Sequence, residues 1–280
     1  MADLRAVLGH ALEPAYRVER EVRPVGNCRL FIALDQSAGP DILVKVLPTP
    51  LSLGVDPVAF AEELRVLGDS LAHPGLVAPQ GGGRAGPFVY HTRAFVQGTT
   101  LRAWLQRHGE LPLRRAVDVL RDVLDALAHA HAAGGVCHGD LKPENVLLTD
   151  GQALVADTGM FGAVQRSWSA GSGSGGEGTR DGHAAAMAGL CAGDYLAPER
   201  RSGGERAGPR DDMFAVGVIL HEMLTGRAPG ARGEPLEEVR AVPEWLKELG
   251  RRCRAAEPGE RWADAGAALA SGGWPGGAPL

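Results

Sequence analysis

Residues 138–148, HGDLKPENVLL, place a His, an Asp, a Lys, a Glu and an Asn within eight positions before the chain becomes apolar. In such a segment Asp140 can accept the proton of a hydroxyl, Asn145 can bind a metal ion, and Lys142 can neutralise developing negative charge. In-line phosphoryl transfer requires this set, because its catalysis consists mainly of positioning and electrostatic stabilisation. The alternative is a solvated turn before a strand, with Pro143 and Asn145 as turn formers. The residue types favour phosphoryl transfer, and the surrounding elements must decide.

The composition is that of an ordinary globular protein, with 44% hydrophobic and 22% charged residues in a chain of 280. This length suits one large domain or two small lobes with a sizeable core. A net charge of −5 gives no electrostatic reason to expect a nucleic acid or an anionic membrane as partner. The four scattered cysteines fit thiols in a reducing cytosol, and the sequence shows no signal peptide and no membrane-spanning stretch. We therefore expect a cytoplasmic protein without a membrane segment.

The elements around the segment change in type along the chain. Residues 16–47 alternate in polarity and contain a turn, which predicts a β-hairpin, and residues 57–71 predict an amphipathic helix. Residues 87–96 predict a further strand, and from residue 100 onward the apolar period becomes helical, with a long helix over 112–135. Gly and Ser dominate residues 165–190 and the tail at 271–280, so both are expected to be disordered or flexible. A β-rich part with one main helix thus precedes a mostly helical part.

Several further segments resemble those of the protein kinase family, in its bacterial Ser/Thr (eukaryotic-like) branch. HGDLKPEN resembles the catalytic loop H-R-D-L-K-P-E-N, and Asp157-Thr158-Gly159 resembles the metal-binding D-F-G. The triplet Ala197-Pro198-Glu199 is the family's A-P-E, and ILVKVL resembles V-A-I-K. The resemblance covers residues 16 to 269 and implies a bilobal α+β kinase fold over residues 1–270, with an N-lobe at 12–94 and a C-lobe at 95–270.

The resemblance implies a role for each residue of the catalytic set. Asp140 would orient and accept from the acceptor hydroxyl, and Lys142 would steady the transferring phosphoryl group. Asn145 and Asp157 would hold Mg²⁺ or Mn²⁺, and the ion would neutralise charge on the phosphates of ATP. The lysine two residues after the aspartate is the pattern of Ser/Thr rather than Tyr kinases, so we expect a protein Ser or Thr as acceptor. The sequence does not identify the protein substrate, and we expect any regulation to come from a protein partner or a segment outside these residues.

On the ATP side, the resemblance makes Lys45 the phosphate-binding lysine, held by a glutamate of the helix at 57–71. Glu63 is preferred over Glu62, because Leu67 then lies one helical turn later on the same face. The remaining ATP-binding positions come from the phosphate-covering loop, the adenine slot and the hinge backbone: Val25, Leu30, Leu43, Ala94 and Val96. The resemblance gives four further residues structural or regulatory roles: His138, Glu199, Asp212 and Arg261. Asp212 would brace the catalytic loop, and Arg261 would pair with Glu199, the A-P-E glutamate.

The chain also departs from the family pattern. Residues 23–30, RPVGNCRL, carry Arg23, Val25 and Cys28 at the three glycine positions of G-x-G-x-x-G-x-V, which predicts weaker nucleotide binding or another loop path. Leu43 narrows the adenine slot, and Arg93 precedes the hinge, where an arginine would need a carboxylate partner. Thr158 replaces the Phe of D-F-G, and Gly139 replaces the Arg that would bind an activation-loop phosphate.

Two alternatives to a protein kinase remain. A pseudokinase that acts as a binding or scaffolding module would explain the altered glycine loop, although the acceptor aspartate and both metal ligands are retained. A small-molecule phosphotransferase would explain Gly139, because the aminoglycoside and choline phosphotransferases use H-G-D-x-x-x-x-N. Those enzymes lack the A-P-E triplet and the following D-x-F-x-x-G helix, and this chain has both.

Overall fold

The computed structural model describes residues 4–25 (the backbone only at 23–25), 28–168, 193–201, 207–229, 242–271 and 274. The chain divides into two compact units. The first comprises residues 1–72, 77–96 and 160–191, and the second comprises residues 73–76, 97–159 and 192–280. The lobe boundary expected after Ala94 stays a prediction, and in the described part of the chain residues 160–168 belong to the first unit rather than the second. Most of the segment 165–190 and of the tail 271–280, both predicted to be flexible, lies outside the described residues.

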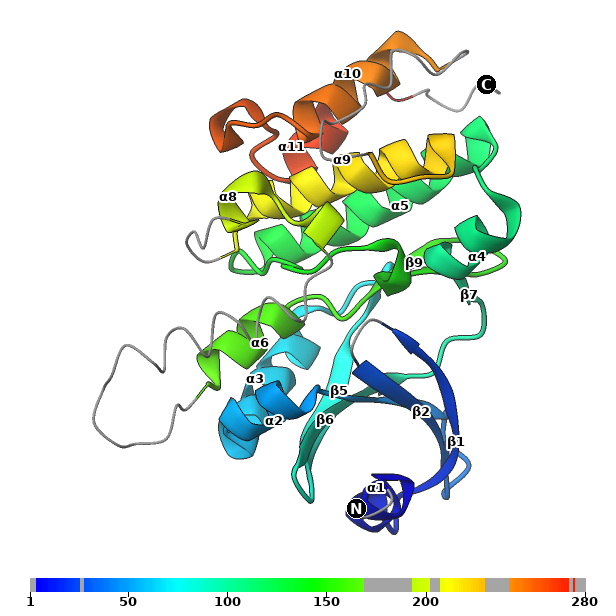
Figure 1. Cartoon of the computed structure of the whole chain (residues 1–280), viewed down its shortest axis with the longest axis vertical. Helices are drawn as coiled ribbons and strands as arrows, with labels where there is room; N and C mark the ends of the chain where they lie inside the picture. The colour runs from blue at the N-terminus through cyan, green and yellow to red at the C-terminus, as the bar shows by residue number, and fades with distance from the viewer. Residues whose placement is uncertain are drawn as a thin grey trace, which may run out of the picture. The chain divides into compact units, whose positions relative to one another are not determined.

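The first unit is built on one five-stranded antiparallel sheet, in the order β1-β2-β3-β6-β5 (Figure 1). The hairpin predicted over 16–47 and the strand predicted over 87–96 are confirmed as β1 to β3 and as β6. The elements of this unit in chain order are α1 (Leu4–Leu12), β1 (Tyr16–Val25), β2 (Cys28–Asp35), β3 (Ile42–Val46), α2 (Thr49–Gly54), α3 (Pro57–Ser70), β5 (Pro79–Ala85), β6 (Phe88–Ala94) and α6 (Met160–Arg166).

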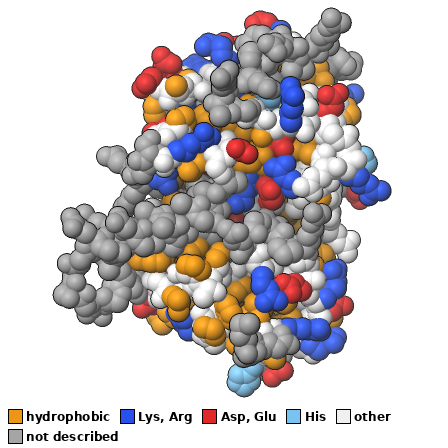
Figure 2. Space-filling model, viewed as in Figure 1, with side chains coloured by type: hydrophobic (Ala, Val, Ile, Leu, Met, Phe, Trp, Pro, Cys, Tyr) orange, Lys and Arg blue, Asp and Glu red, His pale blue; other side chains and the backbone are white. Residues whose placement is uncertain are grey.

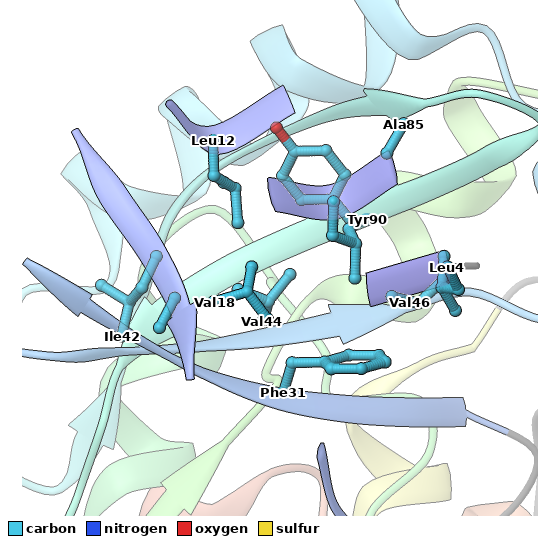
Figure 3. Close-up of a cluster of buried hydrophobic side chains, with 11 residues drawn as sticks. Leu4, Leu12, Val18, Phe31, Ile42, Val44, Val46, Ala85 and Tyr90 are labelled. Atoms are coloured by element: carbon cyan, nitrogen blue, oxygen red, sulfur yellow. The ribbon is translucent and has the colours of Figure 1, made fainter. Parts of the chain in front are cut away.

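Strand alternation gives the sheet two apolar faces. One face carries a cluster of buried side chains that includes Phe31, Val44 and Tyr90 (Figure 3). The helix α1 covers this face, because Leu4, Leu8 and Leu12 recur every four residues and pack into the same cluster. The N-lobe predicted from the sequence begins at residue 12, so the prediction leaves out this covering helix. The other face carries a smaller cluster of Leu30, Ile32 and Leu43.

The amphipathic helix predicted over residues 57–71 is confirmed as α3. Its N-terminus is capped by the Asp56 carboxylate, which accepts hydrogen bonds from the N–H groups of Val58 and Ala59 at 2.8 and 2.9 Å. Pro57 occupies the first helical position. The backbone N–H that proline lacks would have no acceptor within the helix at this position, so its absence costs no hydrogen bond. The helix buries Phe60, Leu64 and Leu67, as its apolar period predicts. Glu63 therefore stands on a helix whose start and buried face are both determined locally.

The second unit is mostly helical and contains a small four-stranded sheet in the order β4-β9-β8-β7. Its long helix α5 buries ten side chains, and α9 is buried along nearly its whole length. The elements in chain order are β4 (Leu76–Val77), β7 (Thr99–Thr100), α4 (Leu101–His108), α5 (Leu113–Ala132), β8 (Val146–Leu148), β9 (Ala153–Ala156), α8 (Pro198–Arg201), α9 (Pro209–Thr225), α10 (Glu244–Cys253) and α11 (Ala265–Ala270), with short 3₁₀ turns at Pro143–Asn145, Gly193–Tyr195 and Pro258–Glu260.

The predicted α+β class, with a β-rich first part and a mostly helical second part, is confirmed. None of the helices that the structure describes is long and apolar enough to cross a membrane. On the face drawn in Figure 2, Lys and Arg side chains are interspersed with Asp and Glu side chains. This mixture is typical of an ordinary solvated protein surface.

Candidate active site

The catalytic segment lies in the second unit, between the end of α5 and the start of β8. The Lys142 ammonium is 2.5 Å from Oδ2 of Asp140, and both side chains are largely buried. The Asn145 amide nitrogen donates to the backbone carbonyl of Asp140 at 2.9 Å, across the 3₁₀ turn Pro143–Asn145. The structure therefore brings together the predicted proton acceptor, cation and metal ligand.

The backbone of this segment is held by Asp212, which lies near the start of α9 and is fully buried. Its two carboxylate oxygens accept hydrogen bonds from the N–H groups of His138 at 2.7 Å and Gly139 at 2.9 Å. Burial opposes the charge on Asp212, but the hydrogen bond from His131 and the backbone N–H donors outweigh it and lower its pKa. The carboxylate therefore stays ionised, and it holds the start of the catalytic segment.

His131 was not singled out in the sequence, yet it is the side-chain partner of Asp212, with Nε2 3.0 Å from Oδ2. The Ala265 N–H donates to Nδ1 of the same ring at 3.2 Å, so Nδ1 carries no proton and Nε2 donates to Asp212. This neutral imidazole links α5, α9 and the start of α11. The sequence offers one signal for His131: it is a polar residue at a position that the apolar period of α5 assigns to the buried face.

The fully buried ring of His138 connects the catalytic segment to the end of β9. Its Nε2 is 3.0 Å from the Ala156 carbonyl oxygen, and its Nδ1 accepts from the Asp140 N–H at 3.3 Å. Because the carbonyl can only accept, Nε2 carries the proton and the ring is neutral. Burial, the largest cause, lowers the pKa of His138 and favours this neutral form. The ring thus positions Asp140 relative to the strand that leads into Asp157.

Two residues of the site have a left-handed backbone. Asp157 has φ of +65°, in a region that non-glycine residues seldom adopt, and its side chain is buried. Such conformations are frequent at functional sites, where the surrounding structure holds them. Gly139, which stands in place of the family's arginine, has φ of +77°. The glycine therefore suits the backbone of this chain at a position where a Cβ would introduce strain. Next to Asp157, the hydroxyl of the buried Thr158 has no hydrogen-bond partner among the described residues.

The predicted ATP-binding residues that the structure describes lie in the first unit. In the pairing of β3 with β2, Lys45 lies opposite Leu30, and Leu43 lies opposite Ile32. Side chains of directly paired residues share a face, so Lys45 lies on the face of the Leu30–Ile32–Leu43 cluster, opposite α1. Lys45 itself is buried.

The other ATP-binding positions lie at the ends of strands. Ala94 ends β6, and Val96 follows it. Arg93, which precedes Ala94, is buried and is paired in register with Leu43. Val25 ends β1 opposite Cys28, and only its backbone is described.

Glu63 has a partner that the sequence did not predict. Its Oε2 is 2.6 Å from Nε of Arg166, the last residue of α6. The sequence predicts flexible chain from residue 165 onward, but α6 continues to Arg166, buries Phe161 and packs against α3. After α6, the Asp56 N–H donates to the Ser167 carbonyl at 2.8 Å. The structure thus gives Glu63 an arginine partner in place of Lys45, and the Lys45–Glu63 pair stays a prediction.

The A-P-E glutamate has the partner that the resemblance implies. Both nitrogens of the Arg261 fork donate to Glu199, at 2.6 and 2.8 Å, and the Arg261 Nε donates to the Ala255 carbonyl at 2.8 Å. Arg261 is only 1% exposed. Burial opposes ionisation of Glu199, but the hydrogen bonds from Arg261 outweigh it and lower its pKa to about 2. The pair attaches α8 to the segment between α10 and α11.

The sequence is similar to one protein family and to several curated proteins. Residues 28–261 match the protein kinase domain. The chain is 29% identical over 252 residues to a probable serine/threonine-protein kinase, pknA2, of Bifidobacterium longum, covering 88% of this chain and 31% of that protein. It is 31% identical to the serine/threonine-protein kinase PknL of Mycobacterium tuberculosis, covering 91% of this chain and 64% of PknL. The PknA kinase of the same species is 32% identical, over 80% of this chain and 50% of PknA. The chain thus spans about a third to two thirds of these relatives.

The fold is similar to the folds of solved structures. The kinase domain of Mycobacterium tuberculosis PknI superposes with a TM-score of 0.69 at 20% identity, covering 92% of this chain and 94% of that chain. Rad53 1–466 in complex with AMP-PNP superposes with a TM-score of 0.67 at 21% identity, covering 91% of this chain and 64% of that chain. At these identities the likeness shows the fold, whereas the family follows from the sequence match over residues 28–261. The curated relatives with which it aligns are bacterial serine/threonine-protein kinases, and the chain belongs to the protein kinase family.

Proposed function

We propose that this chain transfers the γ-phosphoryl group of ATP to a Ser or Thr hydroxyl of a protein. The observation that carries the proposal is the contact between Asp140 and Lys142, on a segment whose backbone N–H groups are held by Asp212. The names of the curated relatives, which are serine/threonine-protein kinases, support the same acceptor class. The net charge and the scattered cysteines support a cytoplasmic location as part of the proposal.

In this proposal Asp140 orients the acceptor hydroxyl and accepts its proton as the oxygen attacks. The neighbouring Lys142 ammonium offsets the negative charge of the carboxylate and of the transferring group, at a site that is largely closed to water. The protein performs no covalent step itself, so the catalytic contribution of the two side chains is positioning and electrostatic stabilisation.

The residues assigned to the metal fit Mg²⁺ or Mn²⁺ by their chemistry. The Asn145 side-chain nitrogen donates to the Asp140 carbonyl, which leaves Oδ1 as the atom available to a cation. Asp157 supplies carboxylate oxygens, and amide and carboxylate oxygens are the donors that hard divalent cations prefer. When bound, the metal ion supplies positive charge to the phosphate oxygens.

On the ATP side, Lys45 binds the α- and β-phosphates in this proposal, and Leu30 and Leu43 contact the adenine from the same face of the sheet. The backbone at Ala94 and Val96 then supplies the hinge hydrogen bonds. The pairing of Lys45 with Glu63 requires Glu63 to leave Arg166. The arrangement described for the first unit is therefore proposed to be a resting form.

A pseudokinase that serves as a binding or scaffolding module is the second candidate. The Glu63–Arg166 ion pair favours it, because it removes the predicted partner of the phosphate-binding lysine. The presence of Arg23, Val25 and Cys28 at the three glycine positions favours it as well.

Phosphate transfer decides between the two. The purified protein is incubated with γ-labelled ATP and Mg²⁺ or Mn²⁺, together with Asp140→Asn and Lys45→Met variants. Two matched controls carry the same changes at other sites: Asp150→Asn at an exposed aspartate and Lys247→Met in α10. We expect label on Ser or Thr in the wild type and both controls, and none in the two site variants. Absence of label from the wild type with either metal, and absence of a thermal shift with ATP, would support the pseudokinase.

A further inference from the structure

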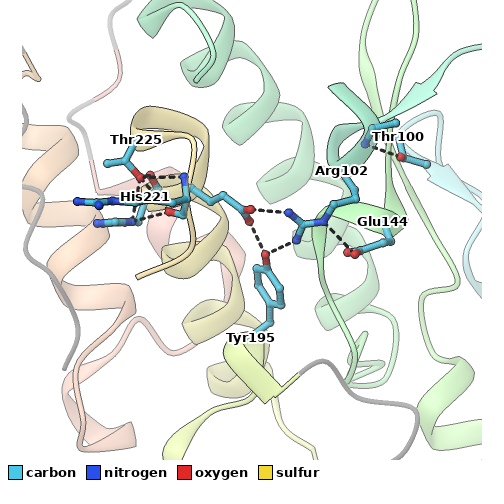
Figure 4. A network of polar contacts seen from close by, with 9 residues as sticks. Thr100, Arg102, Glu144, Tyr195, His221 and Thr225 are labelled. Carbon is cyan, nitrogen blue, oxygen red and sulfur yellow. Dashed lines mark hydrogen bonds and ion pairs between the residues drawn. The ribbon is translucent and has the colours of Figure 1, made fainter. Parts of the chain in front are cut away.

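Arg102, near the start of α4, is bound by three side chains from distant parts of the second unit (Figure 4). Its Nε donates to Oε1 of Glu144 at 2.9 Å, Nη1 donates to Oε1 of Glu222 at 2.5 Å, and Nη2 donates to the Tyr195 hydroxyl at 2.5 Å. The Tyr195 hydroxyl in turn donates to Oε2 of Glu222. We call these four residues the Arg102 network.

The network suits a guanidinium and no other side chain. Three different nitrogens of Arg102 face three different acceptors, whereas the ammonium of a lysine is a single point of charge on a flexible stem. Glu222 is only 4% exposed on its side chain, so its charge depends on the arginine and on Tyr195. Burial, followed by the neighbouring Glu222, raises the pKa of Tyr195, so the phenol stays protonated and donates.

The position of Glu144 connects the network to the proposed catalytic segment. Glu144 is the middle residue of the turn Pro143–Asn145, directly before the predicted metal ligand. Its Oε1 accepts from Arg102, and its Oε2 is buried with no hydrogen-bond partner among the described residues. Arg102 is therefore the described side chain that holds this carboxylate.

The catalytic segment is thus attached to α9 at both of its ends. At the His138 end, Asp212 of α9 binds the backbone directly. At the Asn145 end, Glu222 of the same helix binds Arg102, which binds Glu144. Because α9 is buried along nearly its whole length, it provides a rigid support for both attachments.

We propose that Arg102 is a positioning residue, which acts through Glu144 to hold the Asn145 end of the catalytic segment against α9. As far as it concerns the rate of phosphate transfer, this inference rests on the proposed function. The positioning itself is a property of the backbone and can be measured without any activity. Loss of Arg102 is expected to loosen residues 143–148 and to leave the N–H groups of His138 and Gly139, which Asp212 holds, unchanged.

The first test is hydrogen exchange on the full chain, in the wild type, Arg102→Ala and Glu144→Ala. Glu144→Ala breaks the attachment but leaves Arg102 bound to Glu222 and Tyr195, so it serves if Arg102→Ala folds poorly. Arg251→Ala is the matched control, because Arg251 makes an exposed ion pair with Glu248 on α10. We expect the amides of residues 144–148 to exchange at least about tenfold faster in both site variants than in the control. Unchanged exchange in a folded variant would overturn the proposal.

The second test is refilling of the space with methylguanidinium, which carries the same planar donors as the deleted side chain. Added to Arg102→Ala, it should restore slow exchange at residues 144–148, and it should have no effect on Glu144→Ala. The Arg102→Lys variant, which keeps the charge but lacks the fork, should exchange nearly as fast as Arg102→Ala. If Arg102→Lys exchanged as slowly as the wild type, a positive charge without the guanidinium fork would be sufficient, and the role assigned to Arg102 would be wrong.

The third test uses phosphate transfer. We expect Arg102→Ala to lower kcat about tenfold to a hundredfold, through displacement of the Asn145 end, with a much smaller change in KM for ATP. Methylguanidinium should recover part of kcat in parallel with the exchange protection. A folded Arg102→Ala variant with the wild-type kcat would overturn the catalytic part of the inference. Absence of transfer by the wild type would instead contradict the proposed function, and the exchange experiment would still decide the positioning.

Discussion

Arg166 of α6 is bound to Glu63 of α3, with its Nε 2.6 Å from Oε2 of the carboxylate, although 103 residues separate the two in the sequence. Glu63 is the residue that the kinase resemblance assigns to Lys45. The predicted Lys45–Glu63 pair would need the carboxylate that Arg166 binds, and the packing of α6 against α3 brings Arg166 to it. This relationship leads to the hypothesis that α6 inhibits the proposed phosphate transfer by keeping Glu63 from Lys45.

Replacement of Arg166 by alanine is predicted to increase the initial rate of phosphate transfer, because Glu63 is then free to bind Lys45. The pair is partly exposed, 48% for Arg166 and 28% for Glu63. Such pairs contribute about 0–1 kcal/mol, so the increase should not exceed about fivefold. Initial rates and KM for ATP are the measurements, and Arg65→Ala is the control, because Arg65 pairs with other carboxylates on the same helix. An initial rate that falls or stays constant in Arg166→Ala would contradict the inhibitory role of α6.

Gly139→Arg, which introduces the family's usual residue, is predicted to destabilise the protein by about 1–2 kcal/mol, because φ at this position is +77°. Gly139→Asn should cost less, since asparagine tolerates the left-handed region better than other side chains. Urea unfolding measures both, and Gly151→Arg is the control, because a Cβ at Gly151 would contact nothing within 4 Å. If Gly139→Arg were no less stable than Gly151→Arg, the backbone explanation of this glycine would be wrong.

Arg261→Ala is predicted to lower the free energy of unfolding by about 1–3 kcal/mol, because it removes a buried guanidinium and leaves its acceptors without donors, while the remaining Glu199 carboxylate is 31% exposed and keeps contact with water. The loss has two causes. Glu199 is left without its two strongest donors, and the Ala255 carbonyl loses its bond from Nε. Arg251→Ala removes an arginine from an exposed pair and should change stability by at most about 1 kcal/mol. Similar losses in the two variants, measured by urea unfolding, would refute the role given to the Arg261–Glu199 pair.

The stability of the second unit is predicted to depend on pH through Asp211. Burial, the largest cause, and the neighbouring Glu199 raise the pKa of Asp211 from 3.8 to about 6. The folded state therefore holds this proton more tightly than the unfolded state. Its contribution to stability is fully present below about pH 4 and is lost as the pH rises to about 6. Glu199, with its lowered pKa of about 2, has the opposite dependence, which is confined to pH values below 4.5.

Asp211→Asn, which mimics the protonated form, should remove this dependence. Urea unfolding between about pH 4.5 and 7 is expected to show wild-type stability falling relative to the variant as the pH rises. Asp69→Asn is the control, because that side chain is 76% exposed on α3. Parallel curves for the wild type and Asp211→Asn would contradict the prediction.

Features that depend on near neighbours in the chain could be predicted from the sequence. The Asp56 cap and the apolar period of residues 57–71 specify α3, since both act within one or two helical turns. The order of residues in 138–148 likewise determined that an aspartate, a lysine and an asparagine would be close together. The pairing of Arg261 with Glu199 was expected from the family resemblance rather than from the local sequence.

The partners of charged side chains were decided by the tertiary structure. No local rule distinguishes Lys45 from Arg166 as the partner of Glu63, because the choice depends on whether α6 packs against α3. The bond from Arg102 to Glu222 spans 120 residues, and it exists because the fold brings the start of α4 within reach of both α9 and the turn that carries Glu144. The sequence by itself determined the chemistry of the catalytic segment and the type of the main elements around it. Which carboxylate each arginine binds followed only from the packing of distant helices, because an ion pair forms between groups that the fold brings within a few ångströms.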